Sequence, residues 1–274
     1  MQRQQPIGVF DSGIGGLTVV KELVRLLPHE ELIYFGDTAR VPYGTKSKAT
    51  IVKFSLENVE FLLQHGVKLI VIACNTSSAW ALATLKKYFK VPILGVIRPG
   101  AAGAVELTRT RRIGVIGTPS TIQSRAYEVE LAQLSRQVRV FTQSCPLFVP
   151  LVEEGWEDEA VCLAVARRYL APLLRHRIDT LILGCTHYPL LARVIQRVAG
   201  PRVRLVDSAR RVALEARDLL DREELLRPPG NGPGRRRFIV TDEPERFKRL
   251  GERFLGRRIT NVAKCRNHLM AAVA

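Results

Sequence analysis

Two of the five cysteines, Cys74 and Cys185, follow short apolar runs, residues 69–73 and 180–184, that are typical of buried β-strands. An unperturbed thiol has a pKa of about 8.5, closer to neutral pH than that of lysine or tyrosine. Two thiols on opposite sides of a substrate, one protonated and one not, can remove a proton from one face of a carbon atom and deliver a proton to the other. The pair therefore predicts inversion of a stereocentre next to a carboxylate.

The other cysteines, Cys145, Cys162 and Cys265, are expected to be packing residues, because free cysteine is among the most buried residue types. The total is odd, and no two cysteines form a C-x-x-C pair, which argues against a disulfide framework and a zinc finger. No lysine stands in a motif typical of a pyridoxal Schiff base. We expect neither a metal nor a cofactor.

Polar residues follow the ends of several predicted strands. In open α/β sheets, ligands bind beyond the carboxyl ends of the strands. Such residues can hold the carboxylates and ammonium group of a substrate, and hydrogen-bond donors among them can stabilise a carbanion. The candidates are Asp11, Ser12, Asp37, Asn75, Thr76, Thr118, Thr186 and His187.

Predicted strands and helices alternate along the first two hundred residues. Up to Pro99, strands are predicted at residues 7–10, 32–36, 69–73 and 92–96, and helices at residues 17–27, 47–64 and 77–89. The alternation then restarts, with strands at residues 112–117, 138–142, 180–184 and 203–206, and helices at residues 118–134, 157–174 and 188–198. This order predicts an α/β protein with parallel sheets flanked by helices.

The second set of elements repeats the first. Residues 7–13, Ile-Gly-Val-Phe-Asp-Ser-Gly, parallel residues 113–119, Ile-Gly-Val-Ile-Gly-Thr-Pro. Residues 69–76, which end in Cys-Asn-Thr, parallel residues 180–187, which end in Cys-Thr-His. The separations of 106 and 111 residues nearly agree, which indicates a diverged internal duplication. We expect two similar, pseudo-symmetric lobes, each with a strand ending at a cysteine, and an active site between them.

The tail after Asp207 is too short for a third domain. Its pattern predicts a helix at residues 212–226, a flexible breaker at residues 227–234, a strand at residues 237–241 and a helix at residues 244–255. We expect it to complete one of the lobes.

The formal net charge is +16, which raises the question of nucleic-acid binding. The arginines are spread over predicted helices, and no aromatic residues lie among them as stacking platforms. We therefore expect a solvated basic surface and no specific nucleic-acid partner. No apolar run approaches the roughly 20 residues of a membrane helix, and the N-terminus lacks the features of a signal peptide. No membrane association and a cytoplasmic location are expected.

Five segments between Ile7 and Asp207 resemble the bacterial glutamate racemase family, in the same order and spacing. They are residues 10–18 (Phe-Asp-Ser-Gly-Ile-Gly-Gly-Leu-Thr), 34–44 (Tyr-Phe-Gly-Asp-Thr-Ala-Arg-Val-Pro-Tyr-Gly), 73–79 (Ala-Cys-Asn-Thr-Ser-Ser-Ala), 146–155 (Pro-Leu-Phe-Val-Pro-Leu-Val-Glu-Glu-Gly) and 184–190 (Gly-Cys-Thr-His-Tyr-Pro-Leu). The resemblance implies cofactor-independent interconversion of L- and D-glutamate, which supplies D-glutamate for peptidoglycan in the cell wall.

The resemblance also implies roles for individual residues. Cys74 and Cys185 would be the two acid/base groups. Asp11, Asp37, Glu153 and His187 would assist the thiols, and the substrate contacts would come from Asp11, Ser12, Tyr43, Gly44, Asn75, Thr76, Thr186 and His187. It further implies a homodimer and a discontinuous first lobe, residues 1–98 plus 208–274, with residues 99–207 as the second lobe.

Each assisting residue also has a structural explanation. Asp11 could cap the helix that begins near Gly15, and Asp37 could belong to a structural turn. Glu153, which we expect at a helix start, could be charged surface. His187 could be a hydrogen-bonded loop histidine.

Other functions fit the sequence less well. The Gly13-Ile-Gly-Gly turn is similar to a dinucleotide-binding turn, but Thr18 occupies the place of its third glycine. An aspartyl phosphotransferase would need a second aspartate where Gly13 stands. A basic nucleic-acid-binding module would leave the paired cysteines without a purpose. A racemase for another acidic amino acid, notably aspartate, stays open, because one methylene is worth only about 1–3 kcal/mol.

Overall fold

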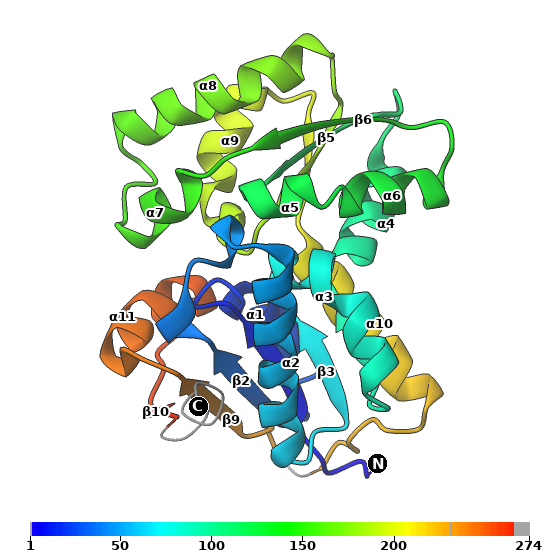
Figure 1. Ribbon diagram of the computed structural model, residues 1–274, viewed down its shortest axis with the longest axis vertical. Helices are drawn as coiled ribbons and strands as arrows, with labels where there is room; N and C mark the ends of the chain where they lie inside the picture. Colours follow the sequence, from blue (N-terminus) through cyan, green and yellow to red (C-terminus); the bar gives the residue numbers. More distant parts are fainter. Residues whose placement is uncertain (1, 231, 266–274) are drawn as a thin grey trace.

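The computed structural model describes residues 2–230 and 232–265 and places them in two α/β lobes, one above the other in Figure 1. Each lobe is built on a parallel sheet, so the predicted fold class is confirmed. We call the elements around the six-stranded sheet the first lobe, and those around the four-stranded sheet the second lobe.

The first sheet has the strand order β10-β9-β2-β1-β3-β4. Its three central strands are buried along their whole length, since helices cover both faces, and Ile7, Val9 and Leu69 are fully buried. Burial of one such side chain stabilises the fold by about 1.5–3 kcal/mol. The strands are β1 (Ile7–Asp11), β2 (Leu32–Gly36), β3 (Leu69–Ile72), β4 (Ile93–Gly95), β9 (Arg236–Val240) and β10 (Val262–Lys264).

The second sheet has the order β6-β5-β7-β8, which repeats the order β2-β1-β3-β4 of the first. The duplicated segments of the sequence therefore occupy equivalent places. β1 and β5 are the strands that pair on both sides, and β3 and β7 lie next to them. The strands are β5 (Arg112–Gly117), β6 (Arg139–Ser144), β7 (Thr180–Gly184) and β8 (Arg204–Val206).

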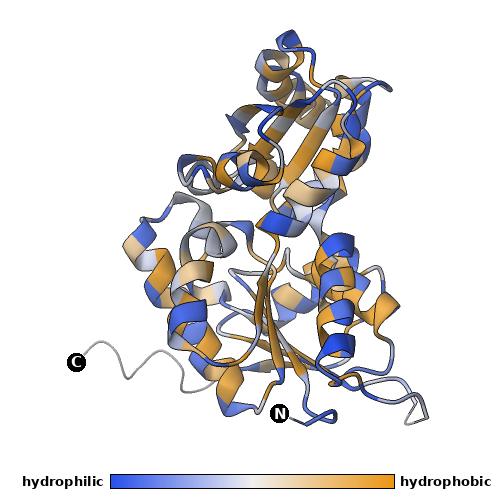
Figure 2. Cartoon of the chain, turned by 90° about the vertical axis from the view of Figure 1, so that its right-hand side faces the viewer, coloured by the Kyte–Doolittle hydropathy of each residue, from blue (hydrophilic) through white to orange (hydrophobic). Residues whose placement is uncertain are grey.

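The helices cover the faces of the two sheets, and Figure 2 shows mainly apolar strands beneath helices of mixed polarity. The α-helices are α1 (Leu17–Leu26), α2 (Lys48–Gln64), α3 (Asn75–Tyr88), α4 (Ile97–Leu107), α5 (Pro119–Gln123), α6 (Ala126–Leu134), α7 (Phe148–Glu153), α8 (Ala160–Arg175), α9 (Ala192–Ala199), α10 (Ser208–Arg222) and α11 (Pro244–Leu255). Short 3-10 turns are η1 (Thr38–Arg40), η2 (Tyr43–Thr45) and η3 (Tyr188–Leu191). None of the described helices is long and apolar enough to cross a membrane.

One predicted helix is wrong, and one observed helix was not predicted. Residues 118–134 do not form one helix, because Arg125 adopts a left-handed conformation with φ of 56° and separates α5 from α6. Helix α4 was not expected, since it contains Pro99 and two glycines. Pro99 lies in the first helical turn, where no backbone N–H is needed. Gly100 allows the start of α10 to approach, because a Cβ there would lie 2.3 Å from the Ser208 Oγ.

The tail returns to the first lobe. Helix α10 begins at Ser208, four residues earlier than expected, and packs against both α1 and α4. Strands β9 and β10 then extend the first sheet beyond β2, and α11 packs against α1 (Figure 1). The boundaries of the lobes after residues 98 and 207 stay a prediction.

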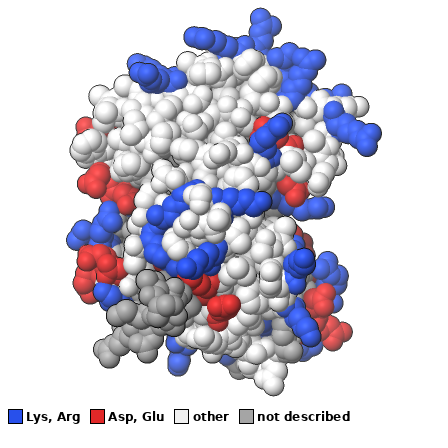
Figure 3. Space-filling view, viewed as in Figure 1, with Lys and Arg blue, Asp and Glu red and all other residues white. Residues whose placement is uncertain are grey.

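Basic residues are spread over the visible face of both lobes, with acidic residues among them (Figure 3). Several arginines of the described chain are paired with carboxylates, for example Arg211 with Glu106 at 2.5 Å and Arg227 with Glu31 at 2.9 Å. The surface charge is therefore distributed and partly neutralised by neighbouring carboxylates.

Candidate active site

A cavity of about 380 Å³ lies between the lobes, at the carboxyl ends of the central strands. Both cysteines of the duplicated motifs, Cys74 and Cys185, line it. Nine further predicted site residues line it as well: Ser12, Tyr43, Gly44, Asn75, Thr76, Thr118, Glu153, Thr186 and His187. The remaining wall is made mainly by prolines and Val149, so most of the enclosing surface is apolar.

Cys74 is the N-cap residue of α3, directly beyond β3. Its Sγ accepts a hydrogen bond from the Ser77 backbone N–H at 3.4 Å and donates to the Ser12 Oγ at 3.8 Å. A helix start ordinarily lowers the pKa of a thiol. Instead, burial and the negative charge of Asp11 together outweigh the hydrogen bonds with Ser77 and Ser12 and raise the pKa of Cys74 to about 11. Cys74 therefore carries its proton at neutral pH.

Asp11 ends β1 beneath the cavity and does not line it. One carboxylate oxygen accepts a hydrogen bond from the Gly13 backbone N–H at 3.0 Å, and the other has no hydrogen-bond partner among the described residues. Helix α1 has Gly16 as its N-cap residue and no side-chain cap, so Asp11 is not the cap of this helix. Burial raises the pKa of Asp11, whereas the charge of His187 lowers it.

Cys185 follows β7 in the second lobe. The chain makes the 3-10 turn η3 before α9 begins, so this thiol does not cap an α-helix as Cys74 does. Its Sγ lies 3.9 Å from the His187 Nδ1, and the His187 Nε2 lies 3.1 Å from the Glu153 Oε1. Glu153 ends α7 rather than beginning a helix, which brings its carboxylate to the cavity.

His187 is a cation beside the Cys185 sulfur. Burial lowers the pKa of His187, but the hydrogen bonds and charges of Cys185 and Glu153 outweigh burial and raise this pKa to about 10. For Glu153, burial raises the pKa, while His187 and Arg246 lower it by more, so the carboxylate stays ionised. The two thiols thus have opposite electrostatic neighbours: an anion near Cys74 and a cation at Cys185.

Polar side chains from both lobes meet at the cavity. The Thr76 hydroxyl lies 3.0 Å from the Thr118 and Thr121 hydroxyls across the lobe boundary. The Tyr127 hydroxyl donates to the Asn75 Oδ1 at 2.7 Å, which leaves the amide N–H₂ of Asn75 free to donate elsewhere. These contacts fix candidate donors for a substrate.

Asp37 lies outside the cavity wall. Its carboxylate accepts hydrogen bonds from the Tyr43 hydroxyl and from the Thr241 hydroxyl at 3.2 Å, and forms an ion pair with Arg40 at 2.6 Å. Asp37 thus positions Tyr43 in the cavity wall, and no hydrogen bond joins it to either thiol in the described chain.

Sequence reasoning missed three residues that hold the site residues in place. Thr121 and Tyr127 contact Thr76 and Asn75, and Arg246 contacts Glu153. Each partner is dozens of residues away in sequence, so no local pattern marks the pair. Of the three, only Thr121 could have been suggested by the sequence, because it lies close in the chain to the predicted site residue Thr118.

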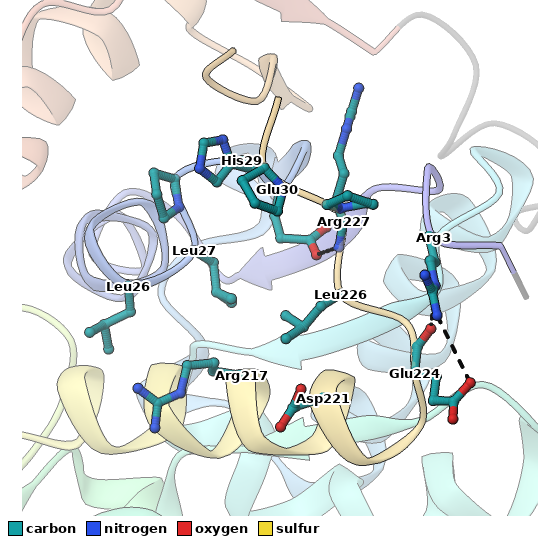
Figure 4. Close-up of a pocket in the computed structure, with 13 residues that line it drawn as sticks. Arg3, Leu26, Leu27, His29, Glu30, Arg217, Asp221, Glu224, Leu226 and Arg227 are labelled. Carbon is teal, nitrogen blue, oxygen red and sulfur yellow. Dashed lines mark hydrogen bonds and ion pairs between the residues drawn. The ribbon is translucent and has the colours of Figure 1, made fainter. Parts of the chain in front are cut away.

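A second cavity of about 600 Å³ lies at the opposite edge of the first sheet, between the end of α1 and α10 (Figure 4). Several of its charged groups are held by hydrogen bonds or ion pairs. The Arg3 guanidinium donates to the Glu224 backbone oxygen at 2.8 Å, and the Arg227 backbone N–H donates to the Glu30 carboxylate at 2.8 Å. Lys68 forms a buried ion pair with Glu30 at 2.6 Å. We assign a structural role to this cluster. In the described residues, no group of three or more His, Cys, Asp or Glu side chains could hold a metal ion.

Comparison with known proteins decides the family. Residues 7–216 match the Asp/Glu/Hydantoin racemase family. A glutamate racemase from Geobacter metallireducens is 52% identical over 256 residues, which cover 93% of this chain and 94% of that protein. The chain belongs to the glutamate racemase family.

Solved glutamate racemases share the whole fold. The crystal structure of an isoform from Bacillus anthracis has a TM-score of 0.92 and 40% identity, over 97% of this chain and 99% of that one. A glutamate racemase from Francisella tularensis in complex with D-glutamate has a TM-score of 0.90 and 40% identity, over 96% of this chain and 98% of that one. The two-lobed architecture is therefore that of the glutamate racemases.

Proposed function

We propose that this protein is a glutamate racemase in which Cys74 and Cys185 are the two acid/base groups and no cofactor takes part. The observation that supports this most is the position of the two thiols in the fold. They stand at equivalent strand ends, after β3 and β7 in different lobes, and line one cavity. A substrate between them would present one face of its α-carbon to each sulfur.

In the direction from L- to D-glutamate, the Cys185 thiolate removes the α-proton. The electron pair of the broken C–H bond moves into the substrate carboxylate and returns to form the new C–H bond as the Cys74 thiol delivers its proton to the opposite face. The products are D-glutamate, a Cys185 thiol and a Cys74 thiolate, so protons and charge balance. The reverse reaction starts from this second state.

The surroundings support that starting state. The imidazolium of His187 favours negative charge on the neighbouring Cys185 sulfur, and Cys74 keeps its proton because its pKa is raised to about 11. Asn75, Thr76, Thr118 and Thr186 supply donors for the carboxylates, and the mainly apolar wall of the cavity strengthens their effect on the carbanion.

The decisive experiment is incubation of purified protein with L-glutamate in deuterated water without added cofactor. We expect loss of optical activity with one deuterium at the α-carbon of the product. Activity that requires added pyridoxal phosphate or a metal would contradict the proposal.

Replacement of either cavity thiol tests the two-base mechanism. Cys74→Ser and Cys185→Ser should each lower kcat/KM by about 10²–10⁴-fold, since a hydroxyl is a far weaker acid than a thiol. Cys265→Ser is the matched control, because Cys265 lies outside the cavity wall, and it should keep the normal rate. A near-normal rate in either of the first two variants would remove that thiol from the mechanism.

We further propose glutamate rather than aspartate as the substrate, on the strength of the relatives. One methylene is worth about 1–3 kcal/mol, so kcat/KM for L-glutamate should exceed that for L-aspartate by about tenfold or more. Equal values would assign the protein to acidic amino acids in general. We also propose that the protein supplies D-glutamate for peptidoglycan and that it is a homodimer. A cytoplasmic location is proposed as well, because the cytoplasm keeps thiols reduced, as the mechanism requires.

A further inference from the structure

We propose that Arg246 is a positioning residue of the racemase reaction. It acts on Cys185 through Glu153 and His187, so that the charge on this thiol depends on contact between the lobes. The inference rests on the proposed function. It concerns a residue of the tail, in the first lobe, whereas the groups it acts on belong to the second.

Arg246 reaches across the boundary between the lobes from the first turn of α11. Its Nη2 lies 3.1 Å from the Glu153 Oε2, while the Oε1 of the same carboxylate lies 3.1 Å from the His187 Nε2. The imidazole is in turn 3.9 Å from the Cys185 sulfur through its Nδ1. Four side chains therefore form one continuous chain of polar contacts that ends at the proposed base.

The ion pair holds a carboxylate that is otherwise free to turn. The Glu153 side chain is 21% exposed and is the last residue of a six-residue helix. Without Arg246, its Oε2 would lose its hydrogen-bond partner in the described part of the chain, and water could draw the carboxylate away from His187. An imidazole that loses its Nε2 acceptor is no longer fixed in orientation or charge, and the Cys185 thiolate loses its counter-ion.

Helix α11 makes a second contact with the same imidazole. The Phe254 ring packs edge-on against the His187 ring, with centroids 5.2 Å apart and an interplanar angle of 82°. Separation of the lobes would remove the Arg246 ion pair and the Phe254 contact together. The charged groups that face His187 are Cys185, Glu153 and, by its electrostatic effect, Asp11.

Helix α11 also supplies a matched control. Arg253, two turns further along, forms an ion pair with Glu157 of the second lobe. This pair joins the same helix to the same lobe, and among the described residues Glu157 forms no hydrogen bond or ion pair with His187. Loss of Arg253 therefore tests lobe contact alone, whereas loss of Arg246 tests lobe contact together with the link to Cys185.

The experiment compares Arg246→Gln, Arg246→Lys and Arg253→Gln in the full-length protein, with wild-type racemase activity as a precondition. We expect Arg246→Gln to lower kcat/KM about tenfold, the effect of one oriented hydrogen bond to a charged group. Because the enantiomers have equal free energy, kcat/KM must fall equally in both directions. Arg246→Lys should recover most of the loss. Arg253→Gln should stay within about twofold of wild type, because the Arg253–Glu157 pair has no link to His187.

Primary isotope effects separate positioning from general damage. In Arg246→Gln, proton transfer at Cys185 becomes slower relative to transfer at Cys74. The isotope effect on kcat/KM should therefore rise for α-deuterated L-glutamate, whose deuteron Cys185 removes, and fall for α-deuterated D-glutamate. Unchanged isotope effects, no loss of rate in Arg246→Gln, an equal loss in Arg253→Gln, or no recovery in Arg246→Lys would each overturn the inference. An inactive wild-type protein would instead refute the proposed function.

Discussion

At the scale of single residues, the two halves of the site are chemically unlike although their strands are equivalent. Cys74 has a buried carboxylate nearby and a serine hydroxyl at 3.8 Å. Cys185 has a histidine at 3.9 Å, and the contacts of this imidazole with Cys185 and Glu153 keep it protonated against the effect of burial. Under the proposed mechanism, Cys74 starts with its proton, and the His187 imidazolium is the counter-ion of a Cys185 thiolate.

His187 should make the protein less stable at high pH. Its pKa rises from 6.5 in the unfolded chain to about 10 in the folded protein, so its stabilising effect is fully present below pH 6.5 and is lost as the pH rises through about 10. The buried Cys74 adds a loss in the same direction above its ordinary pKa.

Urea denaturation at a series of pH values would measure this effect. The comparison is between wild type and His187→Gln, in which the contribution of Cys74 cancels. We expect the free energy of unfolding of the variant to fall less steeply between pH 6.5 and pH 10. Identical slopes would show that His187 does not gain a proton affinity on folding.

Which site residues were predictable depends on how they are placed. Cys74, Cys185 and His187 stand directly after apolar strands, and strand ends meet at one edge of a sheet, so sequence was enough to place them at a common site. Asp37 also ends a strand, but it turns toward Tyr43 and Arg40. Arg246 and Tyr127 reach the site from helices that are close only in three dimensions, and no spacing in the chain encodes such contacts.

At the scale of elements, close approaches between backbone segments decide where helices can lie. The turn between β1 and α1 passes directly under the second lobe. A Cβ at Gly15 would lie 2.2 Å from the Thr186 Oγ1 and 2.6 Å from the His187 Nδ1. Glycine is therefore required for the first lobe to reach the imidazole.

Gly15→Ala should lower kcat/KM about 100-fold or more, because displacement of reacting groups by about 1 Å has this effect. Gly13→Ala is the control in the same turn, since a Cβ there meets only the end of the Val41 side chain, at 3.1 Å. It should lose much less activity. Steady-state kinetics with both variants, and a thermal melt to show that each is folded, measure this. Equal losses would contradict the close approach.

The same physics explains why some helices could not be predicted. The glycines of α4 suggest a loop when taken alone, and their purpose becomes visible only with α10 packed against them. The break at Arg125 has no proline or glycine to mark it. The main strands, by contrast, are continuous apolar runs, and three of those described, β2, β5 and β7, were predicted to the residue.

At the scale of the whole molecule, the two-lobed fold could be predicted because the chain repeats itself. The assignment of the tail to a particular lobe came from resemblance alone. The structure adds its strands β9 and β10 to the outer edge of the first sheet, a place that no pattern of apolar residues specifies. The basic charge is distributed over both lobes on the visible face (Figure 3).

Distributed charge predicts only nonspecific attraction to nucleic acid. Binding to a labelled DNA duplex, measured by fluorescence anisotropy, should weaken steeply with salt and vanish near about 200 mM. Racemase activity should be unaffected by added DNA. Sequence-selective binding that persists at that salt concentration would contradict this interpretation and reopen a nucleic-acid function.

The repeated strand order has a consequence for the timing of successive turnovers. Each lobe contributes one thiol to the proposed reaction. Each turnover therefore leaves the protonated thiol in the opposite lobe from the one where it started. The enzyme that has just released D-glutamate is ready for another D-glutamate, not for L-glutamate, until its two thiols exchange protons with water. The protonation state of the free enzyme thus depends on its last substrate. At high flux, the return of the two thiols to their starting protonation state becomes a step of the catalytic cycle.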